Sequence, residues 1–169
     1  MRTLHYLMAI LMAVCAIAAY AWRERSAREH QALLSATHEA VHRIGQVVKY
    51  QATLEEVPLS PDGWPTTIDP AWFGKVPPHN CLLSRNRPWI EIASPKERHL
   101  LHPENCIAHD ETVAAFWYNP GTGVVRARVP QTVSDRRALD MYNAVNGVEL
   151  SSLFVTTAPS VVADATAHP

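Results

Sequence analysis

The sequence predicts an α+β protein in which one long N-terminal helix packs on a small antiparallel β-sheet, with a proline-rich loop region between them. Three observations support this fold class. No proline or glycine interrupts residues 2–44. Nine of the thirteen prolines lie between Pro58 and Pro103, which excludes long helices from that section. Two strand-like runs with a turn between them then follow.

The long helix is predicted from residue 4 to about residue 50. Within it Ala27, Leu34, Val41 and Val48 recur every seven residues, so one face is apolar while Arg, Glu, His and Gln occupy the other. At ~1.5 Å per residue such a helix would be about 70 Å long. The residues expected to pack the helix on the sheet are Leu34, Val41, Ile44, Val48, Val125 and Val129.

The first part of this helix is predicted to be a membrane anchor. Residues 6–22 are 17 positions without a charge, at the lower limit for spanning a bilayer. The expected anchor residues are Tyr6, Leu11, Tyr20 and Trp22, with the aromatic ones at the membrane interfaces. A cleaved signal peptide is the alternative, because Ala19-Tyr20-Ala21 is an acceptable cleavage site. The chain is thus expected to be a single-pass inner-membrane protein, with the membrane as a partner and the C-terminal domain in the periplasm.

The charges beside the anchor indicate the opposite orientation. Arg23, Arg25 and Arg28 follow the apolar run and only Arg2 precedes it, which favours a cytoplasmic C-terminal part. The cysteines are the reason for preferring export. Cys81 and Cys106 are the only cysteines outside the apolar segment, and in an exported chain they predict one disulfide. Closing a loop of about 25 residues would stabilise the fold by roughly 3 kcal/mol.

The rest of the chain is predicted as follows. Residues 52–112 form loops anchored by Trp64, Trp72, Phe73 and Trp89, with one strand at 89–93. Residues 113–118 and 124–129 form a β-hairpin through the turn 119–123, with Arg126 and Arg128 on its exposed face. A helix runs from the N-cap Ser134 through Asn146, and Gly147 ends it. A short strand is expected near 150–155.

These elements divide the chain into four predicted parts. Residues 1–22 are the anchor, 23–51 the amphipathic helix, 52–157 an α+β head and 158–169 a disordered tail. The formal net charge of −1 gives no reason to expect a nucleic-acid partner. No glycine-rich phosphate loop and no catalytic triad or acid–base spacing occurs, so the sequence predicts neither an enzyme nor a cofactor.

One short motif suggests a zinc protease. His38-Glu39-Ala40-Val41-His42 fits the H-E-x-x-H pattern, in which two imidazoles share a helix face and the glutamate activates a water. A third protein ligand is required, and Val48 stands where the longer metzincin pattern has a histidine. With nine histidines in the chain, we interpret the match as accidental, with His38 and His42 on the solvated side of the helix.

A second group of metal-ligand types surrounds the predicted disulfide. Besides the two cysteines it contains His79, His99, His102 and His109. Its tightest part is Cys106-x-x-His109, but the spacings match no standard zinc finger. A disulfide is the preferred interpretation, a metal site or unpaired thiols are the alternatives, and no metal is predicted. The weak candidate ligands are His38, His42, His102 and His109.

The order of these elements resembles that of type IV pilins and type II secretion pseudopilins. The matching parts are residues 6–50, the loop from Asp62-Gly63-Trp64-Pro65 to Pro78, and the hairpin FWYNPGTGVVRARVP. The glycine-phenylalanine peptidase site of that family and its early helical glutamate are absent. The resemblance implies a membrane-anchored, exported, non-enzymatic structural or interaction protein, with other pilin-like or secretion-system subunits as partners. A secreted or tethered ligand-binding module using the Trp-rich loop is the alternative.

Overall fold

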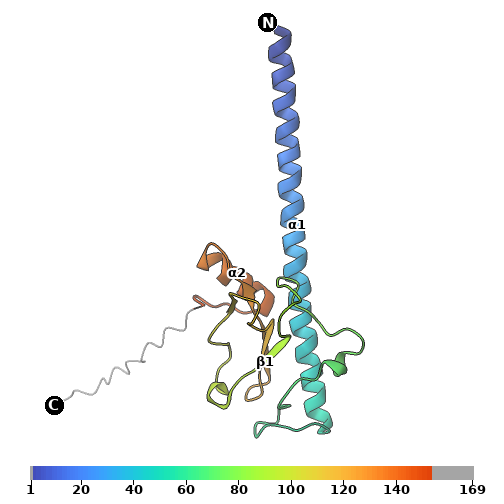
Figure 1. The fold of residues 1–169 in the computed structure, drawn as a ribbon, viewed down its shortest axis with the longest axis vertical. Coiled ribbons are helices and arrows are strands. Elements are labelled where there is room, and N and C mark those ends of the chain that lie inside the picture. The colour runs from blue at the N-terminus through green and yellow to red at the C-terminus, as the bar shows by residue number, and fades with distance from the viewer. Residues whose placement is uncertain (1, 154–169) are drawn as a thin grey trace, which may run out of the picture.

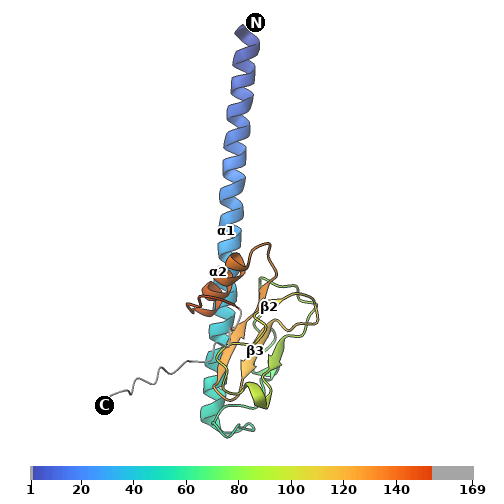
Figure 2. The same cartoon turned by 90° about the vertical axis from the view of Figure 1, so that its left-hand side faces the viewer.

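The computed structural model describes residues 2–153 of the chain, with side chains described from residue 11 onward. Its largest element is the helix α1 (Arg2–Leu54), which is even longer than expected. Leu54 ends it because Glu55 takes a left-handed conformation (φ 55°) and Pro58 follows. The N-terminal half of α1 projects away from the rest of the molecule, and the C-terminal half carries the head, which we define as residues 55–153 (Figures 1 and 2).

The head contains short strands and one regular helix. Its elements are η1 (Pro70–Phe73), β1 (Ile90–Ile92), η2 (Pro95–Glu97), β2 (Ile107–Ala108), β3 (Phe116–Asn119), β4 (Val124–Ala127), β5 (Val129–Pro130) and α2 (Asp135–Asn146). As expected, Ser134 is the N-cap of α2 and Gly147 ends it in the left-handed region. Residues 150–153 do not form the predicted last strand, and the predicted tail 158–169 lies outside the described residues.

The α+β class with a long N-terminal helix is confirmed, but the sheet is mixed rather than antiparallel. β3 pairs with β4 as the predicted antiparallel hairpin, whereas β1 pairs with β3 in parallel. A second parallel pair joins β2 to β5. Parallel strands need a crossover of a dozen or more residues, and residues 93–115 provide one between β1 and β3.

The core lies where α1, β4 and α2 contact one another. Ile44 and Val48 of α1 are fully buried there, and Leu34 and Val41 pack at its edge. Val125 and Val129 are buried on the opposite side of this interface. From α2 the buried side chains include Leu139, Tyr142 and Val145.

Side-chain hydrogen bonds connect α2 to β4 and to α1. The Asn146 amide accepts a hydrogen bond from the Ala127 N–H (2.7 Å) and donates one to the Ala127 carbonyl (3.0 Å), so it pairs with the end of β4 as another strand would. His38 Nδ1 lies 3.1 Å from the Val145 carbonyl oxygen. Since a carbonyl only accepts, that nitrogen carries the proton and bonds α1 to the end of α2.

Arg128 corrects the prediction of an exposed arginine face. Its side chain is only 3% exposed, in the gap between β4 and β5. It forms an ion pair of 2.8 Å with Glu91 and donates to the carbonyls of Asn105 and Ala114. Strand alternation predicted which face of the hairpin Arg128 occupies. It did not predict that the side chain is buried, because residues 105–114 cover that face.

Candidate functional site

The projecting half of α1 exposes large apolar side chains over residues 11–22. These are Leu11, Met12, Val14, Ile17, Tyr20 and Trp22. At 100° per residue they are distributed around the whole helix axis, with no gap wider than about 80°. A helix that is apolar on all sides is normally buried. The segment is therefore a candidate interaction surface, which we call the apolar segment.

The predicted transmembrane anchor is wrong for the described part of the chain. No helix there combines the length and apolarity needed to cross a bilayer. Among the residues whose side chains are described, only 11–22 precede the charges that begin at Arg23, and this stretch is shorter than the ~20 residues that a span requires. Tyr6 lies outside the residues whose side chains are described. The predicted single-pass inner-membrane location depended on this anchor and is therefore wrong as well.

In the HEAVH motif, His38 contacts α2 of the head. His38 is bonded to the Val145 carbonyl as described above, and His42 is exposed on α1. Within residues 11–153, no three His, Cys, Asp or Glu side chains converge in a way that could hold a metal ion. The other weak candidates, His102 and His109, belong to separate surroundings.

The Cys/His group predicted around the disulfide divides into three places. Cys81 Sγ lies 3.4 Å from His79 Nε2, on the loop beside α1. His102 Nδ1 lies 3.1 Å from the Tyr142 hydroxyl, close to buried Cys106. His109 is near Asp110 at the surface. Cys81 and Cys106 are free thiols in the structure, so the predicted disulfide is not formed there.

Burial keeps the Cys106 cluster neutral. It raises the pKa of the Cys106 thiol and, together with the Cys106 sulfur, the pKa of the Tyr142 hydroxyl. Burial also lowers the pKa of His102, and the nearby Arg126 guanidinium lowers it further. A nucleophilic or metal-binding cysteine has to be a thiolate. This cluster packs in the core beneath α2, where burial favours the neutral forms of its side chains.

We expect the two head cysteines to react with thiol reagents at very different rates. Cys81 is partly exposed, whereas Cys106 is buried and its burial disfavours the thiolate. Brief iodoacetamide treatment of the folded chain should modify Cys81 first, and Cys106 only after denaturation, as measured by peptide mass spectrometry. A pair of linked peptides two daltons lighter than the two thiols would instead establish the disulfide.

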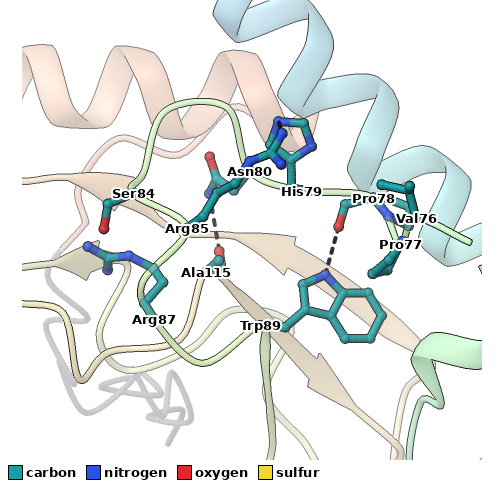
Figure 3. A pocket seen from close by; sticks show the side chains of 10 residues that line it. All are labelled: Val76, Pro77, Pro78, His79, Asn80, Ser84, Arg85, Arg87, Trp89 and Ala115. Atoms are coloured by element: carbon teal, nitrogen blue, oxygen red, sulfur yellow. Dashed lines mark hydrogen bonds between the residues drawn. The ribbon is translucent and has the colours of Figure 1, made fainter.

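The head also contains a pocket of about 220 Å³ between the loop 76–89 and the start of β3 (Figure 3). Val76, Pro77 and Trp89 form its apolar end, and Ser84 and Arg87 lie at the other end. Between them lie Pro78, His79, Asn80, Arg85 and Ala115. We call this the Trp89 pocket.

Hydrogen bonds to the backbone hold the walls of the Trp89 pocket in place. The Trp89 indole donates to the Pro78 carbonyl at 2.7 Å. The buried Asn80 amide donates to the carbonyls of Ala115 (3.1 Å) and Arg128 (2.7 Å). Thr37 of α1 accepts from the Cys81 N–H, which fastens the same loop to the helix. The pocket is thus built on the core and not on a free loop.

Sequence reasoning placed Trp89 in a candidate binding region but missed the cationic partners of the pocket. Arg85 and Arg87 lie in a stretch of loop without any motif spacing, and their proximity to His79 and Trp89 depends on how the loop folds on Asn80. The short section Ser84-Arg85-Asn86-Arg87 beside Trp89 was the available signal. No protein-family model, curated protein or solved structure matches this chain.

Proposed function

We propose that this chain is a pilin-like, non-enzymatic structural protein whose copies assemble through the apolar segment of α1. The observation that carries the proposal is the exposure of large apolar side chains around the whole helix, for example 69% for Ile17 and 76% for Trp22. Nothing in the described part of the chain covers them. Helices of other copies are the occupants that a helix of this kind accommodates best.

The energetics favour several neighbours over one. Burying a large apolar side chain contributes about 1.5–3 kcal/mol, so the six of the apolar segment together contribute about 9–18 kcal/mol when all are buried. Association itself costs an estimated ~4–15 kcal/mol. One partner would cover only one side of the helix and would leave little net gain. Neighbours on several sides bury the whole segment, which is the arrangement of a helical bundle or filament core.

The charged residues after the segment support a change of environment along α1. Arg25 pairs with Glu29 at 2.9 Å, and Arg28 pairs with Glu24 at 2.6 Å. Both are exposed pairs four positions apart, which suit a helix surface in water. We therefore place the boundary of the packed region near Arg23. The heads then lie outside the packed helices, as the resemblance to pilins and pseudopilins implies.

Self-association of the full chain tests the proposal. We expect sedimentation velocity to show large assemblies for the natural chain and monomers for the double variant Leu11→Asp/Ile17→Asp. Aspartates within a packed apolar bundle are buried unpaired charges, which cost several kcal/mol each. The matched control is Ser26→Asp/Gln31→Asp, which adds the same two charges at exposed positions outside the segment. It should still assemble.

Two results would contradict the proposal. The first is a natural chain that stays monomeric up to about 100 µM, well above the µM range of ordinary specific association. The second is a monomer that instead cosediments with phosphatidylcholine vesicles, since lipid would then be the occupant of the segment. Circular dichroism of each variant at a concentration where it is monomeric checks that the head remains folded.

A further inference from the structure

We propose that the Trp89 pocket binds a small organic anion, in which a carboxylate or similar group is attached to a compact apolar body. This is a site separate from the apolar segment, and it does not depend on assembly of the chain. The pocket has an apolar end at Trp89 and a polar end at Arg87 (Figure 3).

The apolar end has the shape for a flat group. Trp89 is held in place by its bond to Pro78 and by edge contacts with the rings of Phe73 (5.6 Å) and Phe116 (6.5 Å). Val76 and Pro77 complete this wall. The cavity volume corresponds to roughly seven waters at ~30 Å³ each, which suits a ligand the size of a single substituted ring.

Arg85, which lies between the two ends, has hydrogen-bond donors that the described part of the protein does not use. None of the ten residues that line the pocket is acidic. Arg85 is exposed, and one of its Nη atoms lies 3.2 Å from His79 Nε2. The guanidinium has five N–H donors, so it can keep this contact and still bind a carboxylate.

Arg87 adds a second and different observation. Its Nη1 donates to the carbonyls of Asp110 and Val113, both at 3.0 Å, which fixes the guanidinium. Its Nε is buried without any hydrogen-bond partner. Because this Nε is closed off from solvent, a ligand in the pocket would meet the Nη atoms of Arg87 and not its Nε. Arg87 therefore supplies a fixed positive charge at its end of the pocket, in addition to the charge of Arg85.

The test uses defined probes and the full chain. Fluorine NMR relaxation of 4-fluorobenzoate and of its neutral analogue 4-fluorobenzamide reports binding even when the protein assembles. We expect the benzoate to bind at millimolar concentration or tighter, and the amide to bind at least tenfold more weakly, because a charge-assisted hydrogen bond is worth about a tenfold or larger factor. Acetate should compete only weakly, since it lacks the ring.

Variants separate the site from general surface charge. Arg85→Gln should reduce benzoate affinity about tenfold or more and leave amide binding unchanged, because Arg85 is exposed and its removal should not disturb the fold. Arg136→Gln is the matched control: Arg136 is also exposed but pairs with Asp140 on its own helix, far from the pocket residues in sequence. It should have no effect.

The inference is overturned by any of four results. One is equal binding of the benzoate and the amide, and another is an unchanged benzoate affinity in Arg85→Gln. The third is an equal loss in both arginine variants, which would mean that the probe responds to surface charge alone. Absence of benzoate binding up to about 20 mM, above the range of even weak specific ligands, would also overturn it.

Discussion

Replacement of Val48 by aspartate is expected to destabilise the head by about 3 kcal/mol or more, and at that magnitude to leave little folded protein. Val48 is fully buried in the core cluster that also contains Val125 of β4 and Val145 of α2. A carboxylate there has no cation to pair with among its core neighbours, and ionisation would put an uncompensated charge between α1 and the sheet. Denaturant unfolding monitored by tryptophan fluorescence measures the loss, because Trp117 is fully buried.

Leu33→Asp provides the matched control on the same helix. Leu33 is 42% exposed, so the new carboxylate remains in water and the free energy of unfolding should change by less than about 1 kcal/mol. Equal destabilisation by the two substitutions would mean that a new charge destabilises α1 wherever it is placed, and that burial against the head is not the cause.

Arg128→Met is expected to cost about 3–5 kcal/mol, the range found when one partner of a buried ion pair is removed. Methionine has a similar length but no donors. The carbonyls of Asn105 and Ala114 would lose the donor that Arg128 provides, and the Glu91 carboxylate would lose its cation. Chemical denaturation of the natural chain and of the variant gives the difference in unfolding free energy.

Substitution of Glu91 tests whether the ion pair or the hydrogen bonds to backbone carbonyls make the larger contribution of Arg128 to stability. The Glu91 side chain is 47% exposed, so Glu91→Gln should cost less than about 1 kcal/mol. If Glu91→Gln destabilises the chain as much as Arg128→Met does, the ion pair is dominant. A small effect of both substitutions would show that water replaces the guanidinium and that our account of this gap is mistaken.

Local patterns of the sequence were sufficient to predict α1, the β3–β4 hairpin and α2. The seven-residue repeat from Leu34 to Val48 located the face of α1 that the head covers, and Ser134 and Gly147 located both ends of α2. The turn 119–123 located the hairpin, in which Gly123 has φ 69°. A side chain at Gly123 would meet the Trp64 ring, so the turn also needs glycine for close packing.

Long-range pairing was beyond these patterns. Nothing in residues 90–92 signals whether the strand joins β3 in parallel or antiparallel, because the direction depends on the path of the crossover. The burial of Arg128 has the same cause, since its partners come from distant loops. The anchor prediction rested on the absence of charge over residues 6–22, but no helix in the described part of the chain is long and apolar enough to cross a bilayer.

Because α1 is one unbroken helix, the way copies of it pack would determine the orientation of the heads in an assembly. Described residues 2–54 form one helix without a hinge, so packing at one end and the head at the other end move as one rod. In an α-helix, sliding by one residue translates the rod by only ~1.5 Å but rotates it by about 100°. A change of one residue in how neighbouring helices fit together would therefore leave the length of the assembly almost unchanged, while the heads would face a different direction. In such an assembly the packing register of the helices would therefore set the direction in which the heads face.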